Sequence, residues 1–404
     1  MLTSSALVLL MVPGLALFYG GMVQRKNILT TMMHSFIAMA VIGVQWILIG
    51  YCLAFGRSRG GVIGFDASLL GLSGLPHTQL FGDKGIPELV FVMFQGKFAI
   101  ITPALISGAI AERVRLRGYL LFIMLWSTFV YCPLAHWVWA NGGWLNNLGV
   151  LDFAGGTVVH ISAGVSALVL ALLVGPRLDH RPGGGETNRP NNLVLTLTGA
   201  GLLWFGWFGF NAGSAVAAEA PVSGSVAGLA FTTTQAAAAA AALAWMLVER
   251  WHHGKATSVG FASGIVAGLV VITPAAGHVH PIHALLMGAA ASVACYTAIQ
   301  LKNKTRLDDS LDAFAVHGVG GIMGALLVGV FCFTPVGGLL AGSPAQLGKQ
   351  AIGVLVTIGY CAAMTLGIGW LVQKTVGLRA TKEAERDGLD LKIHGEAGYY
   401  IEMA

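Results

Sequence analysis

Charged residues are scarce in this sequence. Only 10% of its 404 residues are Asp, Glu, Lys or Arg, whereas 55% are hydrophobic. A water-soluble domain carries about 25% charged residues, so this chain has too little polar surface to cover a soluble globule of its size. The deficit extends over the whole length. This deficit therefore excludes a soluble domain that is attached to the membrane by a single helix, and it predicts one membrane-embedded domain.

Other absences narrow the function. The five cysteines lie in apolar runs without CxxC spacing, which is typical of buried hydrophobic side chains rather than of disulfides or metal ligands. The net charge of +5 comes from short loops, so we expect no nucleic-acid partner. The N-terminal stretch 1–21 lacks a basic segment and a cleavage site. We interpret it as a first membrane span rather than as a signal peptide.

Apolar runs long enough to cross a bilayer recur along the chain. A span needs about 20 apolar residues, and Gly, Pro, Asn or charged residues separate the candidates. We predict an all-α membrane protein with eleven transmembrane helices, at approximately 2–23, 30–56, 88–111, 117–139, 154–175, 192–216, 222–249, 257–274, 281–301, 311–333 and 348–373.

The loops between these spans predict the orientation. Eighteen of the 23 Lys and Arg residues fall on one side, in loops near 25, 113–117, 177–189 (including Arg189), 250–255 and 302–306 and in the tail. The opposite side carries only Arg57, Arg59, Lys84 and Lys349. The positive-inside rule then places the N-terminus outside and the C-terminus in the cytoplasm. Termini on opposite sides of the membrane require an odd number of spans, and eleven is odd.

Two histidines stand in matching apolar surroundings, His160 in span five and His317 in span ten. Both occur in the pattern Val-His-x-x-small-Gly, with an aspartate shortly upstream (Asp152 and Asp312). Ionisable residues inside a membrane are costly and usually functional. Because each unit has an odd number of spans, five, the second unit must cross the membrane in the opposite orientation to the first. We predict an inverted five-plus-five repeat that brings the histidines together midway across the bilayer. Two unrelated histidines bonded to backbone carbonyls are the alternative.

Several stretches resemble the signatures of ammonium transporters of the Amt/Mep/Rh family, bacterial Amt type. They are "PGLALFYGG" (13–21), "FQGKFAIITPALISGAIAER" (94–113), "AHWVWANGGW" (135–144), "LDFAGGTVVHISA" (151–163), "WFGFNAGS" (207–214) and "DDSLDAFAVHGVGG" (308–321). The resemblance runs essentially end to end and includes the tail (377–400). It implies recruitment of ammonium at an outer site formed by Trp139, Phe98 and Ser214. It also implies a gate of two phenyl rings, Phe98 and Phe210.

The resemblance gives the paired histidines a role. An imidazole titrates near neutral pH and offers one donor and one acceptor. His160 and His317 are therefore expected to line the pore and relay the proton while neutral ammonia crosses. Asp152 is assigned a supporting role. From the residues alone it serves either as a carboxylate that favours a cation at the mouth or as a cap on the following helix, and both can hold together.

Lys97 departs from the family pattern, which has a small or hydroxyl residue between the two aromatics of "FQGKF". A lysine pointing into the pore would repel the cation. We therefore expect it to extend outward or to pair with Glu88 or Asp83. The cluster "HVHPIH" (278–283) is interpreted as a solvated turn, with a surface metal site as the alternative.

The domain boundaries follow from these patterns. Residues 1–373 form a transmembrane transport domain, with repeat one at 1–175, repeat two at 192–333 and span eleven at 348–373; residues 374–404 form a cytoplasmic regulatory tail. The resemblance implies a homotrimer in the inner, cytoplasmic membrane. It also implies a PII-type regulatory protein at the tail, methylammonium as a substrate analogue, and no cofactor or enzymatic activity.

Three alternatives remain open at this point. A receptor that binds ammonium and signals through its tail would carry the same binding residues. A passive channel for ammonia or carbon dioxide, of the Rh type, would lack the recruitment of the cation. An intramembrane metalloenzyme is the most distant, because neither His160 nor His317 has a nearby Cys or Glu in the sequence to complete a ligand set.

Overall fold

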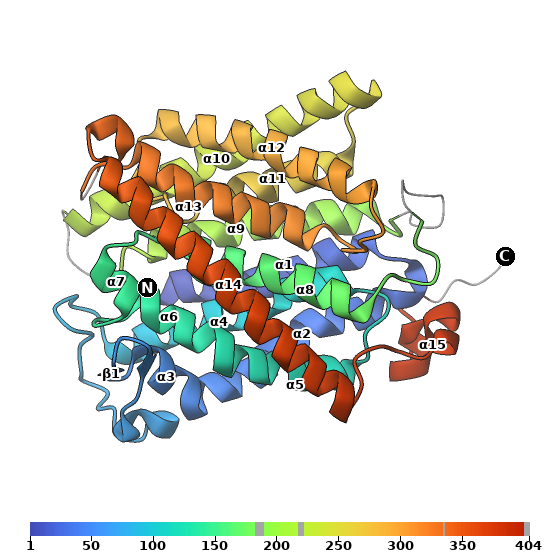
Figure 1. Cartoon of the computed structure of the whole chain (residues 1–404), viewed down its shortest axis with the longest axis horizontal. Helices are drawn as coiled ribbons and strands as arrows, with labels where there is room; N and C mark the ends of the chain where they lie inside the picture. Colours follow the sequence, from blue (N-terminus) through green and yellow to red (C-terminus); the bar gives the residue numbers. More distant parts are fainter. Residues whose placement is uncertain (182–189, 217–221, 334–335, 400–404) are drawn as a thin grey trace.

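The computed structural model describes the chain except for residues 182–189, 217–221, 334–335 and 400–404. Arg189 and the last five residues of the predicted tail thus lie outside the described part. The described part is a bundle of helices (Figure 1), with one two-stranded antiparallel ribbon in which Ser58 pairs with Gly64.

The elements follow in chain order. The α-helices are α1 (Leu2–Met22), α2 (Ile28–Gln45), α3 (Tyr51–Phe55), α4 (Glu88–Ile110), α5 (Leu116–Trp126), α6 (Cys132–Trp139), α7 (Trp144–Leu148), α8 (Ser162–Val174), α9 (Leu193–Gly213), α10 (Val222–His253), α11 (Ser258–Ile272), α12 (Pro281–Asn303), α13 (Gly320–Phe331), α14 (Pro344–Thr375) and α15 (Lys382–Asp387). The strands are β1 (Ser58–Arg59) and β2 (Ile63–Gly64). The 3₁₀ turns are η1 (Arg25–Asn27), η3 (Ala67–Leu72) and η8 (Leu339–Ala341).

Five further segments are π-helical: η2 (Trp46–Gly50), η4 (Ser127–Tyr131), η5 (Gly156–Ile161), η7 (Phe314–Val319) and η9 (Asp390–His394). A π-turn inserts an extra residue into a helix and is frequent at functional sites. Segments η5 and η7 lead directly into α8 and α13, and they carry His160 and His317.

Ten helical stretches among the described residues are long and apolar enough to cross a membrane. They correspond to ten of the predicted spans. The exception is the span predicted at 257–274, where α11 has only 15 residues. At a rise of 1.5 Å per residue, α11 alone is about 22 Å long, which is shorter than the hydrocarbon core of a bilayer.

Small residues let helices from the two halves of the sequence approach closely. Helix α1 packs along α9, where a Cβ atom added at Gly199 would lie 2.3 Å from the backbone nitrogen of Phe18. A Cβ atom at Gly21 would lie 2.4 Å from Thr196 Oγ1. Such close backbone contacts drive helix association in a membrane, where burial of apolar surface cannot.

Similar contacts join α8 to η7 and α13 to η5. A Cβ atom at Gly164 would lie 2.2 Å from the backbone nitrogen of Gly318, and one at Gly321 would lie 3.1 Å from that of Ile161. When the chain is aligned on its two histidines, Gly164 corresponds to Gly321 and Ile161 to Gly318. The contact is therefore reciprocal, as between two related units.

The ends of the bundle differ in character. One end, here the Trp139 end, carries β1, β2 and α7, and the other, the Arg113 end, carries α15 (Figure 1). At the Arg113 end, the side chain of Arg113 is fully buried. It donates to the carbonyls of Gly175 (2.8 Å) and Ala109 (2.9 Å), and to Ser310 Oγ (2.5 Å).

Asp308 connects this arginine to a second one, Arg177. Its carboxylate accepts from the side chain of Arg177 at 2.9 Å and lies 3.8 Å from Arg113. Burial alone would raise the pKa of the Asp308 carboxyl, but the two guanidinium groups outweigh burial and hold its pKa at about 2. Arg177 also forms an ion pair with Glu112, which itself adopts a left-handed backbone conformation (φ +70°).

We expect Arg113→Met to lower the free energy of unfolding by about 3–5 kcal/mol, because it removes one partner from a buried ion pair and leaves several carbonyls without a donor. Thermal unfolding of the purified protein in detergent measures this effect. Arg306→Met, at an exposed position of the same end, is the control and should leave the transition unchanged. Equal transitions for the two variants would show that the cluster does not stabilise the fold.

The described part of the tail is ordered against the Arg113 end rather than extended. Asp390 accepts from the backbone nitrogens of Leu29 (2.9 Å) and Thr30 (2.8 Å) and so caps α2. Glu385 accepts from the backbone nitrogen of Leu178 and pairs with Arg379 at 2.9 Å. The tail thereby touches the α1–α2 connection and the segment that follows α8.

Candidate functional site

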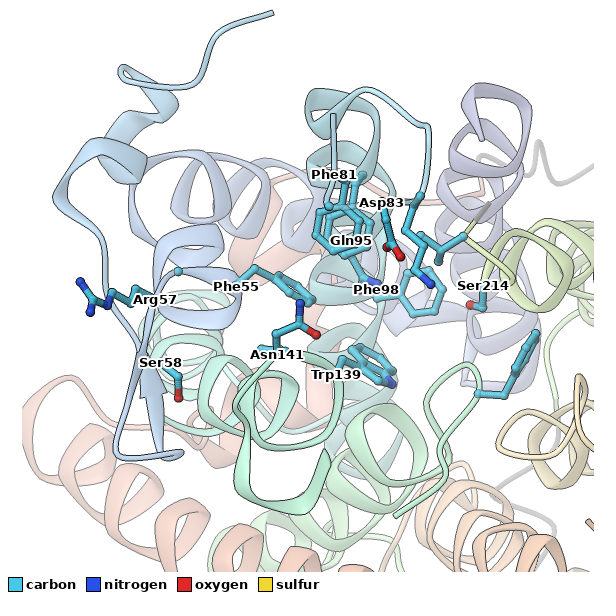
Figure 2. Close-up of a pocket in the computed structure, with 17 residues that line it drawn as sticks. Phe55, Arg57, Ser58, Phe81, Asp83, Gln95, Phe98, Trp139, Asn141 and Ser214 are labelled. Carbon is cyan, nitrogen blue, oxygen red and sulfur yellow. The ribbon is translucent and has the colours of Figure 1, made fainter. Parts of the chain in front are cut away.

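A cavity of about 720 Å³ opens at the Trp139 end. The three residues predicted to recruit a cation, Trp139, Phe98 and Ser214, all line it. They come from the end of α6, from α4 and from the residue after α9, respectively. Figure 2 shows these side chains around the inner part of the cavity, whereas the guanidinium of Arg57 lies at its far side.

Hydrogen bonds fix the two polar members of this set. Trp139 Nε1 donates to the carbonyl of Asp152 at 2.9 Å, and the Phe98 ring meets the indole edge-on, with 5.9 Å between centroids. Ser214 Oγ donates its single hydrogen to the carbonyl of Phe210 at 2.9 Å. The hydroxyl therefore has only acceptor capacity left for a ligand. An acceptor beside aromatic rings suits a cation that carries N–H groups.

Two stacked phenyl rings close the inner end of the cavity. The rings of Phe98 and Phe210 lie 4.1 Å apart between centroids at an interplanar angle of 25°. Each side chain is only 1% exposed. A hydrated ion cannot pass such a stack without displacing a ring and losing its water.

The predicted histidine pair lies beyond the rings. The Nδ1 atoms of His160 and His317 are 3.3 Å apart, and the imidazoles are nearly parallel at 14°. Only one hydrogen fits between two facing nitrogens, so one ring donates and the other accepts. The Trp207 indole stacks on His160 at 5.4 Å. Sequence analysis missed Trp207, although it stands three residues before Phe210 in a quoted motif.

A second, small cavity runs along the histidines. It measures about 10 Å³, which is room for about one water molecule. Apart from the two imidazoles and the Trp207 indole, its lining is apolar: Met11, Leu15, Phe18, Ile101, Leu105, Val159, Leu203, Phe210 and Val266. His160 Nε2 has no hydrogen-bond partner among the described residues. Such a cavity suits a small neutral molecule and disfavours an ion.

Asp152 is a helix cap in this structure. Its carboxylate accepts from the backbone nitrogens of Gly155, Gly156, Thr157 and Val158, and from the hydroxyl of Thr157. It is not among the residues that line the large cavity. It nevertheless holds both parts of the site, because it caps η5, which carries His160, and its carbonyl accepts from Trp139.

One sequence pairing is wrong. Asp312 was paired with Asp152, but the residue that performs the same task in the second half is Asp309. Asp309 stands eight residues before His317, as Asp152 does before His160. It accepts from the backbone nitrogens of Ala313 (3.0 Å) and Phe314 (2.7 Å) at the start of η7. Asp312 instead pairs with Lys302 at 2.5 Å.

Lys97 does not line the large cavity, and its side chain is half-buried. The expected pairing with Glu88 is absent, because Glu88 accepts from the Tyr51 hydroxyl (2.7 Å) and from the Gln79 amide (2.6 Å). Asp83 is also unpaired with Lys97 within the described part of the chain, and it lines the cavity instead.

The rings of His280 and His283 meet edge to face with 5.8 Å between centroids, and each also packs on a phenylalanine. His280 stacks on Phe333 at 3.8 Å and His283 on Phe331 at 4.8 Å. No group of three His, Cys, Asp or Glu side chains suited to a metal ion occurs in the described ranges. Nothing in this region therefore favours the metal site considered from the sequence.

Comparison with known proteins decides the family. The sequence model described as "Ammonium Transporter Family" matches residues 1–399. The chain belongs to the ammonium transporter family. The ammonium transporter of Aquifex aeolicus is 50% identical to it, over 99% of this chain and 92% of that protein. This membership makes the chain a multi-pass membrane protein.

Solved structures of the family have the same architecture. The structure of Saccharomyces cerevisiae Mep2 superposes with a TM-score of 0.86 at 36% identity, covering 94% of this chain and 86% of that one. A structure named Sensor Amt Protein superposes with a TM-score of 0.87 at 30% identity, covering 97% of this chain and 96% of that one. Names given to members of this family thus include both transporters and a sensor.

Proposed function

We propose that this chain moves ammonium across the inner, cytoplasmic membrane as ammonia and a proton that travel separately. The observation that carries the proposal is the order of the parts. An aromatic cavity with a hydroxyl acceptor leads to a closed phenyl pair, and beyond this pair a small, mostly apolar cavity is lined by two histidines in contact.

Capture relies on replacing water of hydration. Removing water from a small cation costs many kcal/mol in an apolar medium. Cation–π attraction to Trp139 and Phe98 offsets part of this dehydration cost, by about 0.5–2 kcal/mol for each ring. Ser214 Oγ accepts a hydrogen bond from one N–H of the cation. The proton of ammonium passes to the Nε2 atom of His160, which has no partner among the described residues and whose ring lies 6.3 Å from that of Phe210 between centroids. The ammonia left behind passes Phe98 and Phe210 when the rings move apart.

The histidines give the proton its own path. His160 and His317 share one hydrogen, so a proton arriving at one ring can leave from the other without both becoming charged. Ammonia meanwhile uses the apolar lining beside them. Net charge therefore crosses the membrane although no ion enters the apolar channel. Asp152 supports the path by holding η5 and Trp139 in place.

We expect Ser214→Ala to raise the ammonium concentration for half-maximal transport about 3- to 10-fold, with little change in the maximal rate. The change removes one hydrogen bond to a charged ligand, of which water replaces a part. Currents at graded ammonium concentrations in proteoliposomes measure it. Ser68→Ala, which removes an exposed hydroxyl bonded to Asp66, is the control. An unchanged half-saturation in Ser214→Ala would remove Ser214 from the site.

The topology belongs to the same proposal. Eleven spans, with α11 as the eighth, form two inverted repeats, 1–175 and 192–333, followed by span eleven (348–373). The reciprocal contacts of Gly164 and Gly321 and the matching caps Asp152 and Asp309 support this. The arginine-rich Arg113 end faces the cytoplasm, so the Trp139 end and its cavity face outward.

The proposed assembly is a homotrimer of domain 1–373, regulated through the tail (374–404) by a PII-type protein. The tail's contacts with the α1–α2 connection and with the segment after α8 supply a path from a cytoplasmic partner to the pore helices. Neither a cofactor nor enzymatic turnover is part of the proposal.

A receptor is the second candidate. The structural likeness to a protein named Sensor Amt Protein favours it, and the outer cavity would serve a receptor equally well. Transport and sensing differ in flux, because a receptor binds ammonium in the cavity without moving charge or ammonia.

A further inference from the structure

One buried polar side chain of the large cavity has no hydrogen-bond partner among the described residues. Gln95, on α4, lines the cavity and is only 7% exposed. Its Oε1 is buried, and its amide makes no hydrogen bond to any described residue. The other uncharged polar side chains of α4 are satisfied, since Thr102 Oγ1 donates to the carbonyl of Phe98 and Ser107 Oγ to that of Ala104.

An unpaired buried amide costs about 1–3 kcal/mol. A structure tolerates this where a ligand supplies the missing partner, and the position of Gln95 fits that explanation. It precedes Phe98 by three residues, which places the two side chains on the same face of α4, one turn apart. Figure 2 shows Gln95 beside Phe98 on the α4 side of the cavity and Ser214 on the α9 side.

The amide has the chemistry for a cation. Its oxygen has two lone pairs, and a half-turn about the last side-chain bond exchanges the positions of oxygen and nitrogen. The oxygen is buried, and this half-turn brings it to the other position, from which it presents an acceptor to the cavity. Ser214 has only acceptor capacity left, as shown above. Two neutral acceptors in the cavity that Phe98 also lines match a cation with several N–H groups, such as ammonium.

We propose that Gln95 is a second hydrogen-bond acceptor for ammonium in the outer cavity and sets the affinity together with Ser214. This inference rests on the proposed transport of ammonium and adds a binding residue to it. The neutral amide binds the cation without the strong hold of a carboxylate, so that release toward the phenyl pair stays fast.

Three variants test this role in proteoliposomes. Gln95→Met keeps the length of the side chain and removes the acceptor, and it should raise the half-saturating ammonium concentration about 10-fold with the maximal current largely kept. Gln95→Glu keeps an acceptor and adds charge, and it should lower the half-saturating concentration. Gln45→Met is the matched control. Gln45 is equally buried and its Oε1 is also unpaired among the described residues, although its Nε2 donates to Thr128 Oγ1 at 3.1 Å. Gln45 does not line the cavity.

Binding is measured in parallel as the stabilisation of each purified protein by added ammonium chloride, with sodium chloride as reference. Weaker stabilisation of Gln95→Met than of Gln45→Met supports the inference, even in a protein that shows no flux. Wild-type half-saturation and wild-type stabilisation in Gln95→Met overturn it. A loss of maximal current at unchanged half-saturation also overturns it, because that result indicates a packing role. Absence of flux in the wild-type protein contradicts the transport proposal instead.

Discussion

Replacing both His160 and His317 with alanine is expected to reduce the current evoked by an ammonium jump at least 10-fold, while ammonia still permeates. The reason is the 3.3 Å contact between the two Nδ1 atoms, which forms the proposed proton path. Alanine side chains leave an apolar channel that is wider than in the wild type. Neutral ammonia therefore passes, whereas a proton has no group to occupy.

Current and luminal pH together measure this effect in proteoliposomes. Ammonia that enters without its proton makes the lumen alkaline, whereas joint entry of ammonia and a proton does not. The matched control is the double variant His280→Ala, His283→Ala, which removes two histidines that stack on phenylalanines away from the pore pair. A current of wild-type size in His160→Ala, His317→Ala would show that the proton takes another path.

Replacing Asp152 with alanine is expected to destabilise the protein by at least about 4 kcal/mol and to abolish transport. Four backbone N–H groups and the Thr157 hydroxyl lose their acceptor in a buried place, and each unsatisfied group costs about 1–3 kcal/mol. Asp152→Asn should fall between alanine and the wild type, because the amide keeps one acceptor oxygen and turns a donor toward the same N–H groups.

Thermal unfolding in detergent and the yield of monodisperse protein measure the loss. Asp66→Asn serves as the control, since Asp66 caps the short turn η3 near the surface through a single backbone bond to Ser68; its effect should stay below about 1 kcal/mol. A stable Asp152→Ala protein that merely binds ammonium more weakly would contradict the capping role. That outcome would favour a carboxylate that attracts the cation.

Much of the fold was predictable because a membrane imposes simple rules on a sequence. The span expected at 88–111 is Glu88–Ile110, and the one expected at 192–216 contains α9, Leu193–Gly213. Length and apolar character suffice for such helices. They do not suffice for α11, where the apolar run continues to residue 274 but the helix ends at Ile272. Hydropathy reports the apolar character of a stretch and does not locate the end of a helix.

The site was predictable in part. The matching patterns around His160 and His317 indicated that the histidines meet, and the structure places them in contact. In the second half, the aspartate nearest to His317 in the sequence is Asp312, but the aspartate that caps the histidine-bearing segment is Asp309. Equal spacing to the histidine, eight residues in both halves, was the available signal for Asp309.

Other contacts carried no sequence signal. Glu88 stands on the same helix as Lys97 but is occupied by Tyr51, a residue of α3. The unpaired amide of Gln95 likewise depends on what surrounds it in three dimensions. Hydrogen-bond partners between distant segments follow from packing, and the local pattern of residues does not determine them.

The most direct test of ammonium transport combines two readings on wild-type proteoliposomes after an ammonium jump: membrane current and luminal pH, with protein-free vesicles as reference. We predict an inward current that saturates with ammonium concentration, with no luminal alkalinisation beyond that of the reference. Alkalinisation without current would make the protein an ammonia channel. Neither response, from a protein that ammonium still stabilises, would contradict transport and identify a receptor.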